Sequence, residues 1–261
     1  MILRLFWLII LLGIHLNGYA NVSTINESTL QGKWYLSPSL GASILNVTKE
    51  HSLSTGEGWP NDLYTNHKIA TAPLVAISGG YSWSTLQTFL PFLMMGLSYT
   101  YYAPATVKGT ITQYSLPQFE NYNYQYKVER QTVFALFKAS LFHYRHVMPY
   151  LSLGVGQTFN SISRYNESPI SSSIVPRLSP FFQNNRNAQL SYILNAGIDF
   201  VKNQHTWFGL EYHYGYFGHA QSGFGMNGYS SDYLKTKLTD NALAVSITYF
   251  FNGKSTGERT K

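Results

Sequence analysis

The chain has 261 residues, no cysteine and a formal net charge of +6; 11% of its residues are charged and 16% are aromatic. Ordinary soluble domains carry about 25% charged residues, and disordered chains combine high charge with few aromatics, so this composition is typical of neither class. A bundle of membrane helices is excluded beyond residue 20, because the longest apolar run there, 89–97, falls short of the roughly 18 residues that a spanning helix needs.

The first twenty residues have the three parts of a secretory signal peptide. A basic start at 1–4 precedes an apolar stretch at 5–16 and a small-x-small cleavage site at 18–20. A membrane anchor is the alternative, but the apolar stretch is short and lacks a stop-transfer flank. We therefore expect export, with a signal peptide over 1–20. The lack of cysteine argues against a disulfide-rich secreted domain.

Beyond the signal peptide, the sequence repeats the two-residue period of β-strands. In the first segment Trp34 and Leu36 alternate with Ser37 and Ser39, and seven further segments follow the same rule. In chain order the predicted strands are 33–47, 74–83, 93–101, 130–141, 150–159, 190–200, 208–216 and 243–251. The pattern predicts an all-β fold.

Two all-β architectures produce such alternation. A soluble sandwich or barrel buries its large apolar face and keeps a charged face in water, whereas a transmembrane barrel turns the apolar face to lipid and encloses small and polar groups. The polar faces here consist mostly of Gly, Ser, Thr and Asn with a few isolated charges. This composition favours the membrane barrel.

The lengths of the connections point to the same architecture. Long connections at 48–73, 103–125, 160–188 and 218–240 alternate with short ones at 84–88, 143–146 and 202–205. The prediction is an eight-stranded antiparallel up-and-down transmembrane β-barrel over 21–251, with four long extracellular loops and short periplasmic turns. A short polar periplasmic tail, 252–261, follows it.

Aromatic residues on the expected outer face fall into two groups, one at each end of the strands. Such rings prefer the two membrane interfaces. The predicted belts contain Trp34, Trp83, Phe200, Phe208, Tyr249 and Phe251 at one end, and Tyr99, Tyr101, Phe159, Tyr214 and Tyr216 at the other.

Segments 149–156, 195–200 and 208–214 resemble the last strands of opacity-type and OmpA-like outer-membrane barrels of Gram-negative bacteria. The resemblance implies a place in the bacterial outer membrane, contact with outer-membrane lipid and lipopolysaccharide, and insertion by the outer-membrane assembly machinery. It also implies a possible ligand on a host surface. The chain departs from that family in continuing past the last aromatic strand.

Six ionisable residues are expected in the lumen: Lys33, Arg130, Lys138, Asp199, Glu211 and His213. A buried charge needs a partner, so we expect Arg130 or Lys138 to pair with Glu211 or Asp199. Side chains fill the interior of an eight-stranded barrel. A satisfied network is therefore favoured over the alternative, a narrow channel with a gated path for protons or ions.

The sequence offers little support for catalysis or a bound metal. His219 and Ser222 weakly echo lipid A deacylases, which keeps a lipid A-modifying barrel enzyme as an alternative. His143 and His146 flank a predicted turn without the further ligands that a tetrahedral metal site needs. We expect no metal, no cofactor and, because the basic residues form no outward patch, no nucleic-acid partner.

Tyrosine-rich loops remain as the carriers of function, because long loops on a rigid scaffold commonly bind ligands. Candidate contact residues are Tyr114, Tyr122, Tyr124, Phe181, Phe182, Tyr229 and Tyr233. The sequence predicts a non-enzymatic outer-membrane barrel for adhesion, host or surface interaction and envelope integrity. Loops that merely shield the rim of the barrel are the alternative.

Overall fold

The computed structural model describes residues 32–54, 58–66, 70–85, 87–177, 180–225 and 232–251. The expected signal peptide, the polar tail and Tyr229 lie outside these ranges. The strands are β1 (Lys33–Val47), β2 (Glu50–Leu53), β3 (Asp62–Asn66), β4 (Ala70–Ser84), β5 (Phe92–Thr112), β6 (Glu120–Ser140), β7 (Val147–Pro169), β8 (Asn185–Val201), β9 (Thr206–Phe224) and β10 (Tyr233–Phe251). Within the described ranges, no helix is long and apolar enough to cross a membrane.

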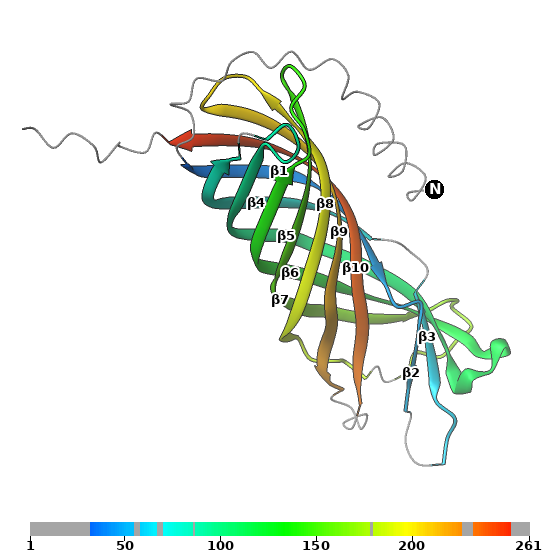
Figure 1. Ribbon diagram of the computed structural model, residues 1–261. Helices are drawn as coiled ribbons and strands as arrows, with labels where there is room; N and C mark the ends of the chain where they lie inside the picture. The colour runs from blue at the N-terminus through cyan, green and yellow to red at the C-terminus, as the bar shows by residue number, and fades with distance from the viewer. Residues whose placement is uncertain are drawn as a thin grey trace, which may run out of the picture.

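Eight of these strands close into the predicted antiparallel transmembrane barrel (Figure 1). The order around the ring is β1, β4, β5, β6, β7, β8, β9 and β10, and β10 pairs again with β1. Three short connections, 85–91, 141–146 and 202–205, lie together at what we call the turn end. The other four connections lie at the opposite, loop end, and the prediction of the fold is confirmed.

Strands occupy much of the sequence predicted as loop. β5 continues to Thr112 and β6 begins at Glu120, so their connection shrinks to 113–119, which holds two short 3-10 helices, η3 (Gln113–Ser115) and η4 (Pro117–Phe119). The hairpin of β2 and β3 adds to this end, because β3 pairs with the last residues of β5. The barrel therefore projects well beyond its lipid-facing surface.

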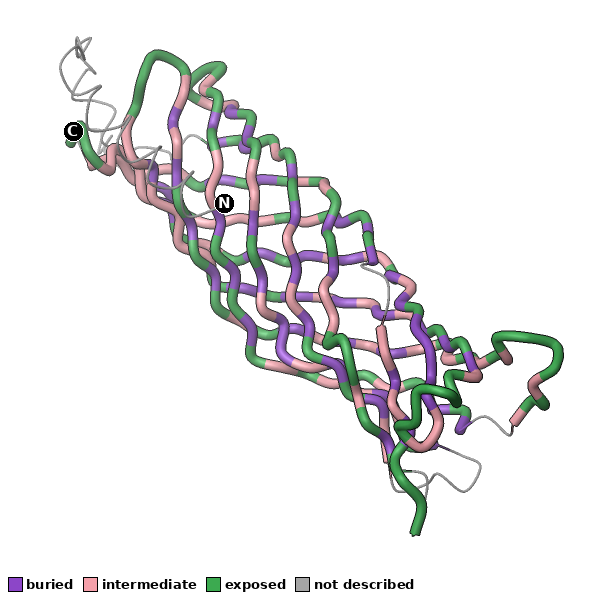
Figure 2. Tube along the Cα trace, turned by 90° about the vertical axis from the view of Figure 1, so that its right-hand side faces the viewer, coloured by how far each residue is buried: buried purple, intermediate pink, exposed green. Residues whose placement is uncertain are grey.

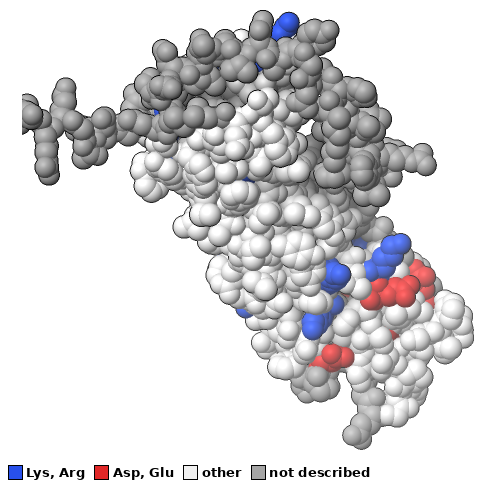
Figure 3. Space-filling model, viewed as in Figure 1, with Lys and Arg blue, Asp and Glu red and all other residues white. Residues whose placement is uncertain are grey.

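The apolar face of the strands changes side along the barrel. Near the turn end and through the middle, the outer face is apolar, as at Leu97, Leu153 and Leu243, each at least 48% exposed. Figure 2 shows buried and exposed residues alternating along the strands, and in the first half of β6 the buried residues are apolar and the exposed ones polar. Charged side chains are correspondingly absent from the middle of the face shown in Figure 3 and gather toward the loop end.

Two regions are named by this difference. The membrane half is the part with the apolar outer face. The loop half is the part with the apolar core, whose buried members include Leu45, Tyr64, Tyr102, Val107, Ile111, Tyr124, Tyr126, Val128, Ile162, Phe182, Phe217, Leu234 and Leu238. A smaller cluster of Tyr35, Met94, Met148, Trp207 and Phe250 fills the barrel at the turn end.

The wall of the loop half is bonded differently between β8 and β9. Their backbone ladder stops at Tyr192 opposite Tyr216, although both strands continue. Beyond it, Asn160 Nδ2 donates to Phe217 O at 2.7 Å and Asn187 Nδ2 donates to His219 O at 2.7 Å. Asparagine side chains thus satisfy the β9 carbonyls that a neighbouring strand would otherwise pair.

Candidate functional site

The lumen of the membrane half holds five of the six predicted ionisable residues in two groups, whereas Lys33 donates to Gln204 O at the turn end. In the first, Lys138 Nζ lies 2.7 Å from Asp199 Oδ2 and 3.6 Å from the centre of the Tyr150 ring. Tyr150 Oη donates to Glu211 at 3.0 Å. These residues come from β6, β8, β7 and β9, so the group ties together four strands across the lumen.

The second group is centred on Arg130, whose partner is Asp240 on β10. Arg130 Nη1 lies 3.0 Å from Asp240 Oδ2, and Ser43 bonds both side chains. His213 Nε2 lies 3.5 Å from Asp240 Oδ1, and the guanidinium lies 4.1 Å from the Tyr102 ring centre. Asp240 was missed because its position was predicted to be the end of a long loop, whereas it lies inside β10.

The lumen around Arg130 is filled. Arg130, Thr132, Phe134, Thr158 and Phe217 are each at most 1% exposed. A second cross-section is closed by the apolar cluster at the turn end. Buried side chains therefore fill the described lumen at two levels.

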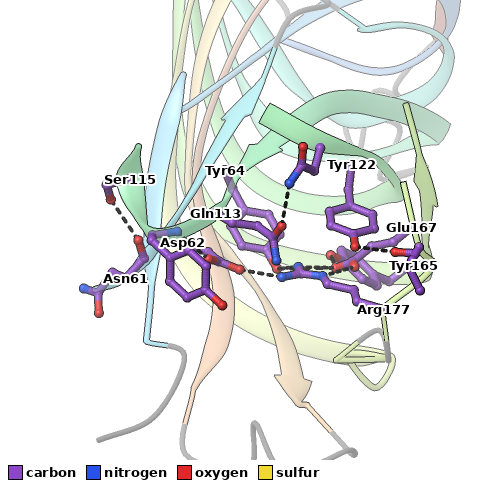
Figure 4. A network of polar contacts seen from close by, with 12 residues as sticks. Asn61, Asp62, Tyr64, Gln113, Ser115, Tyr122, Tyr165, Glu167 and Arg177 are labelled. Atoms are coloured by element: carbon purple, nitrogen blue, oxygen red, sulfur yellow. Dashed lines mark hydrogen bonds and ion pairs between the residues drawn. The ribbon is translucent and has the colours of Figure 1, made fainter. Parts of the chain in front are cut away.

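A third polar group joins the loops of the loop half, and Arg177 is its centre (Figure 4). Its guanidinium bonds Asp62 of β3 at 2.5 Å and Glu167 of β7 at 3.0 Å. The same group donates to Tyr64 Oη at 3.2 Å. Tyr165 Oη also donates to Glu167. A loop residue thus fastens the β2–β3 hairpin to the end of β7.

Burial favours the neutral form of the two tyrosines in this group. Burial raises the pKa of Tyr64, and the nearby Glu167 raises it further. Burial likewise raises the pKa of Tyr165, with added contributions from Tyr64 and Glu167. Both phenols stay protonated at neutral pH and can donate to the carboxylate, so the network is satisfied without a bound ion.

Three aromatic side chains lie next to this network at the outer end of the barrel, and we call them the aromatic tip: Trp59, Tyr114 and Phe119. The ring centres of Trp59 and Tyr114 lie 5.5 Å apart, and those of Tyr114 and Phe119 lie 6.4 Å apart. Trp59 is 65% exposed and Phe119 is 40% exposed. Asp62, which binds Arg177, also accepts the backbone N–H of Tyr114 at 3.0 Å.

Other predicted contact residues lie elsewhere than expected. Tyr122 and Tyr124 are strand residues of β6 with buried, inward-facing side chains, and Phe182 is buried as well. Their expected exposure was wrong: Tyr122 and Tyr124 lie on the apolar face of β6 that turns inward, and Phe182 packs into the core of the loop half from the connection before β8. Phe181 is 45% exposed, and Tyr233 begins β10 with its side chain half-buried. Trp59 was missed, although the turn sequence around it, 58–62, marks a hairpin.

The remaining candidates can be placed on the barrel as well. Ser222 is buried and bonded to the backbone of Gly223 and Leu234, whereas His219 lies on the outer face of β9. The two residues cannot form a nucleophile–base pair across the sheet. No group of three or more His, Cys, Asp or Glu that could hold a metal occurs in the described parts of the chain.

The residues of the predicted aromatic belts all point outward. Trp34, Tyr249 and Phe251 are 62%, 48% and 45% exposed near the turn end. Tyr99 and Tyr214 are 43% and 39% exposed on the side toward the loop half. Trp83, Tyr101, Phe159 and Tyr216 are half-buried on the outer face, and Phe200 and Phe208 are exposed.

No family model matches the sequence, and no curated protein matches it. Solved structures similar to this chain include Neisserial surface protein A (13% identity, 85% of this chain, 99% of that chain, TM-score 0.45) and the outer membrane protein OprG from Pseudomonas aeruginosa (13%, 85%, 97%, 0.46). Another is Ail, the attachment invasion locus protein of Yersinia pestis (14%, 83%, 99%, 0.33). At these identities and TM-scores the likenesses carry no argument about activity or partners.

Proposed function

We propose that this chain is a non-enzymatic barrel of the bacterial outer membrane, related to the opacity-type and OmpA-like barrels. Its loop half would present a rigid contact surface for host or other surfaces. The exposed aromatic tip carries the proposal. Exposed rings supply a large contact area with few rotatable bonds, which suits them to binding.

Support for the tip comes from its attachment. The backbone N–H of Tyr114 donates to the Asp62 carboxylate, and Ser115 Oγ donates to Asn61 O at 2.8 Å. Asp62 is 2% exposed and is held by Arg177. A surface held in one conformation loses less entropy on binding than a mobile loop. The apolar core of the loop half supports the segments that carry the aromatic tip.

The apolar outer face between the two aromatic belts supports a place in the outer membrane, with the loop end outside the cell. Residues 1–20 would direct export and be removed. The filled lumen disfavours the narrow channel. The opposite directions of His219 and Ser222 disfavour the deacylase-like alternative.

The test is attachment of bacteria that express the full chain to cultured host cells and to protein-coated plastic. We expect the triple variant Trp59→Ala, Tyr114→Ala, Phe119→Ala to lose most of the attachment while it keeps the heat-modifiable mobility of a folded barrel. Tyr144→Ala is the matched control, because Tyr144 is 46% exposed in a turn at the opposite end. Equal attachment by the triple variant and the parent would refute the proposal.

A further inference from the structure

Three basic side chains lie together on the outer face of β9 and β10, just beyond the aromatic belt, and we call them the basic cluster: His219, Lys235 and Lys237. Lys235 and Lys237 are exposed at successive outward positions of β10, and His219 is the ladder partner of Lys237. Lys237 Nζ lies 5.3 Å from the centre of the Tyr216 ring, a belt residue. The cluster therefore begins where the lipid-facing surface ends.

A β-bulge builds the cluster. Up to Tyr216 the even-numbered residues of β9 face outward. Tyr216 pairs with Thr239 and His219 pairs with Lys237, so β9 has one extra residue between these two pairs. Gly218 takes a φ of +70° at this point, a conformation that glycine adopts without strain. Beyond it His219 faces outward, and Asn187 fixes its carbonyl.

The positive charge of the cluster is not balanced on its own strands. The carboxylates of β8, β9 and β10 are Asp199, Glu211 and Asp240, and all three bond to groups in the lumen. Among the described residues, neither Lys235 nor Lys237 forms an ion pair. Asp232 ahead of β10 accepts the backbone N–H groups of Ser54 and Tyr233.

The nearby cation of β8 is turned away from the cluster. Arg186 is exposed, but its guanidinium lies 5.0 Å from the centre of the Phe159 ring of β7 and donates to Gln131 of β6 at 3.0 Å. On the other side of the cluster, Lys49 is followed by Glu50, and both are exposed. The positive charge of the cluster is therefore that of Lys235 and Lys237 on β10.

We infer that the basic cluster binds the phosphate groups of a phosphorylated lipid headgroup in the outer leaflet. Cations at the rim of a lipid-facing surface meet anionic headgroups there, and an aliphatic lysine stem lying along a belt ring suits that interface. Continuity with the lipid-facing surface points to a lipid rather than to a free phosphate ion. The inference is independent of the proposed function, because the aromatic tip takes no part in it.

The test measures lipid retention by the full chain folded in detergent micelles. The probes are bisphosphorylated lipid A and lipid A from which both phosphates have been removed, with retained lipid counted by native mass spectrometry. We expect the double variant Lys235→Gln, Lys237→Gln to bind the phosphorylated lipid about thirtyfold more weakly, since each lysine near a charged membrane surface contributes about a factor of five. Retention of the dephosphorylated lipid should be weak and unchanged.

Matched variants separate charge from fold. Lys108→Gln with Lys127→Gln removes two lysines from the outer faces of β5 and β6 and should leave retention unaltered. Lys235→Arg with Lys237→Arg keeps both positive charges and should retain the lipid like the parent. This variant tests the role of charge even if the glutamine variant fails to fold. Equal retention of both lipids by the parent, equal loss in the Lys108 and Lys127 variant, or full displacement by inorganic phosphate would overturn the inference.

Discussion

The membrane half and the loop half use the same strands with opposite faces. In β10, Leu243 and Val245 face outward and are 60% and 49% exposed. Only a few residues away, Leu234 and Leu238 face inward and are at most 2% exposed. Side chains alternate between the inner and outer face along the whole of β10. What differs between the halves is therefore the surroundings of the outer face, which are lipid in the membrane half and water in the loop half.

The two halves therefore gain stability in different ways. The membrane half places apolar side chains in lipid and must satisfy the polar and charged groups in its lumen by pairing. The loop half is folded against water and buries an apolar core as a soluble β-barrel does. The Arg130 group lies at the level where the two regimes meet, because Arg130 contacts both Asp240 and the rings of Tyr102 and Phe217.

The largest loss of stability is expected from breaking the Arg130–Asp240 pair. Arg130→Met leaves the fully buried Asp240 without its cation, and removing one partner of a buried pair costs about 3 to 5 kcal/mol. Urea unfolding of the folded chain in lipid vesicles, followed by tryptophan fluorescence, measures the free energy of unfolding. Adding Asp240→Leu should restore much of the loss. A double variant no more stable than Arg130→Met would contradict the importance of the pair.

The difference between the halves can be tested within β10. Leu238→Ala removes side-chain atoms from a fully buried position of the loop half, and we expect a loss of about 2 to 5 kcal/mol because a cavity remains. Leu243→Ala makes the same change at a lipid-facing position, where lipid fills the space and no enclosed cavity forms. Only the transfer free energy of the removed carbons is then lost, so the cost should be smaller, about 2 kcal/mol. Equal losses in urea unfolding would mean that both halves are packed alike.

Charge placed on the outer face gives the converse test. Leu153→Arg puts a cation into the lipid-facing surface of β7 and should cost about 2 to 4 kcal/mol near the middle of the membrane. Gln125→Arg makes the charge substitution on the outer face of the loop half, where a surface change costs about 0.5 kcal/mol or less. Unfolding in vesicles compares the two variants, and a larger loss for Gln125→Arg would invert the assignment of the halves.

The membrane half could be predicted from the sequence because its signal is unambiguous. Large apolar residues alternate with small polar ones, and the short turns mark where the strands end. The loop half could not be predicted, because its apolar residues lie on the inner face of the strands, whereas the pattern of a transmembrane barrel places them on the lipid side. Tyr122 and Tyr124 continue the period of β6, but their rings belong to an interior core, and the same tyrosines in a loop would look no different in composition.

The polar groups were predictable in part for the same reason. Lys138 and Asp199 lie in strands that the alternation identifies, and the structure brings them together. Asp240 lies in the part of β10 where the faces exchange roles, so it was counted with a loop. The outward position of His219 depends on the bulge at Gly218, and a single glycine in a strand does not reveal which way the following residues face.

A smaller effect is expected where the loop half departs from a regular ladder. Asn160 is fully buried and donates to Phe217 O and His219 O in place of a neighbouring strand. Asn160→Ala leaves Phe217 O without its donor, whereas Asn187 Nδ2 still donates to His219 O. A buried unsatisfied group costs about 1 to 3 kcal/mol. Asn160→Asp is the matched control: the lost N–H donors should give a comparable or larger loss without a change in side-chain size. Hydrogen exchange should quicken first in residues 217–223 of β9 and leave the β9 residues of the membrane half protected. Exchange that quickens equally along β9 would show that the two halves unfold as one unit.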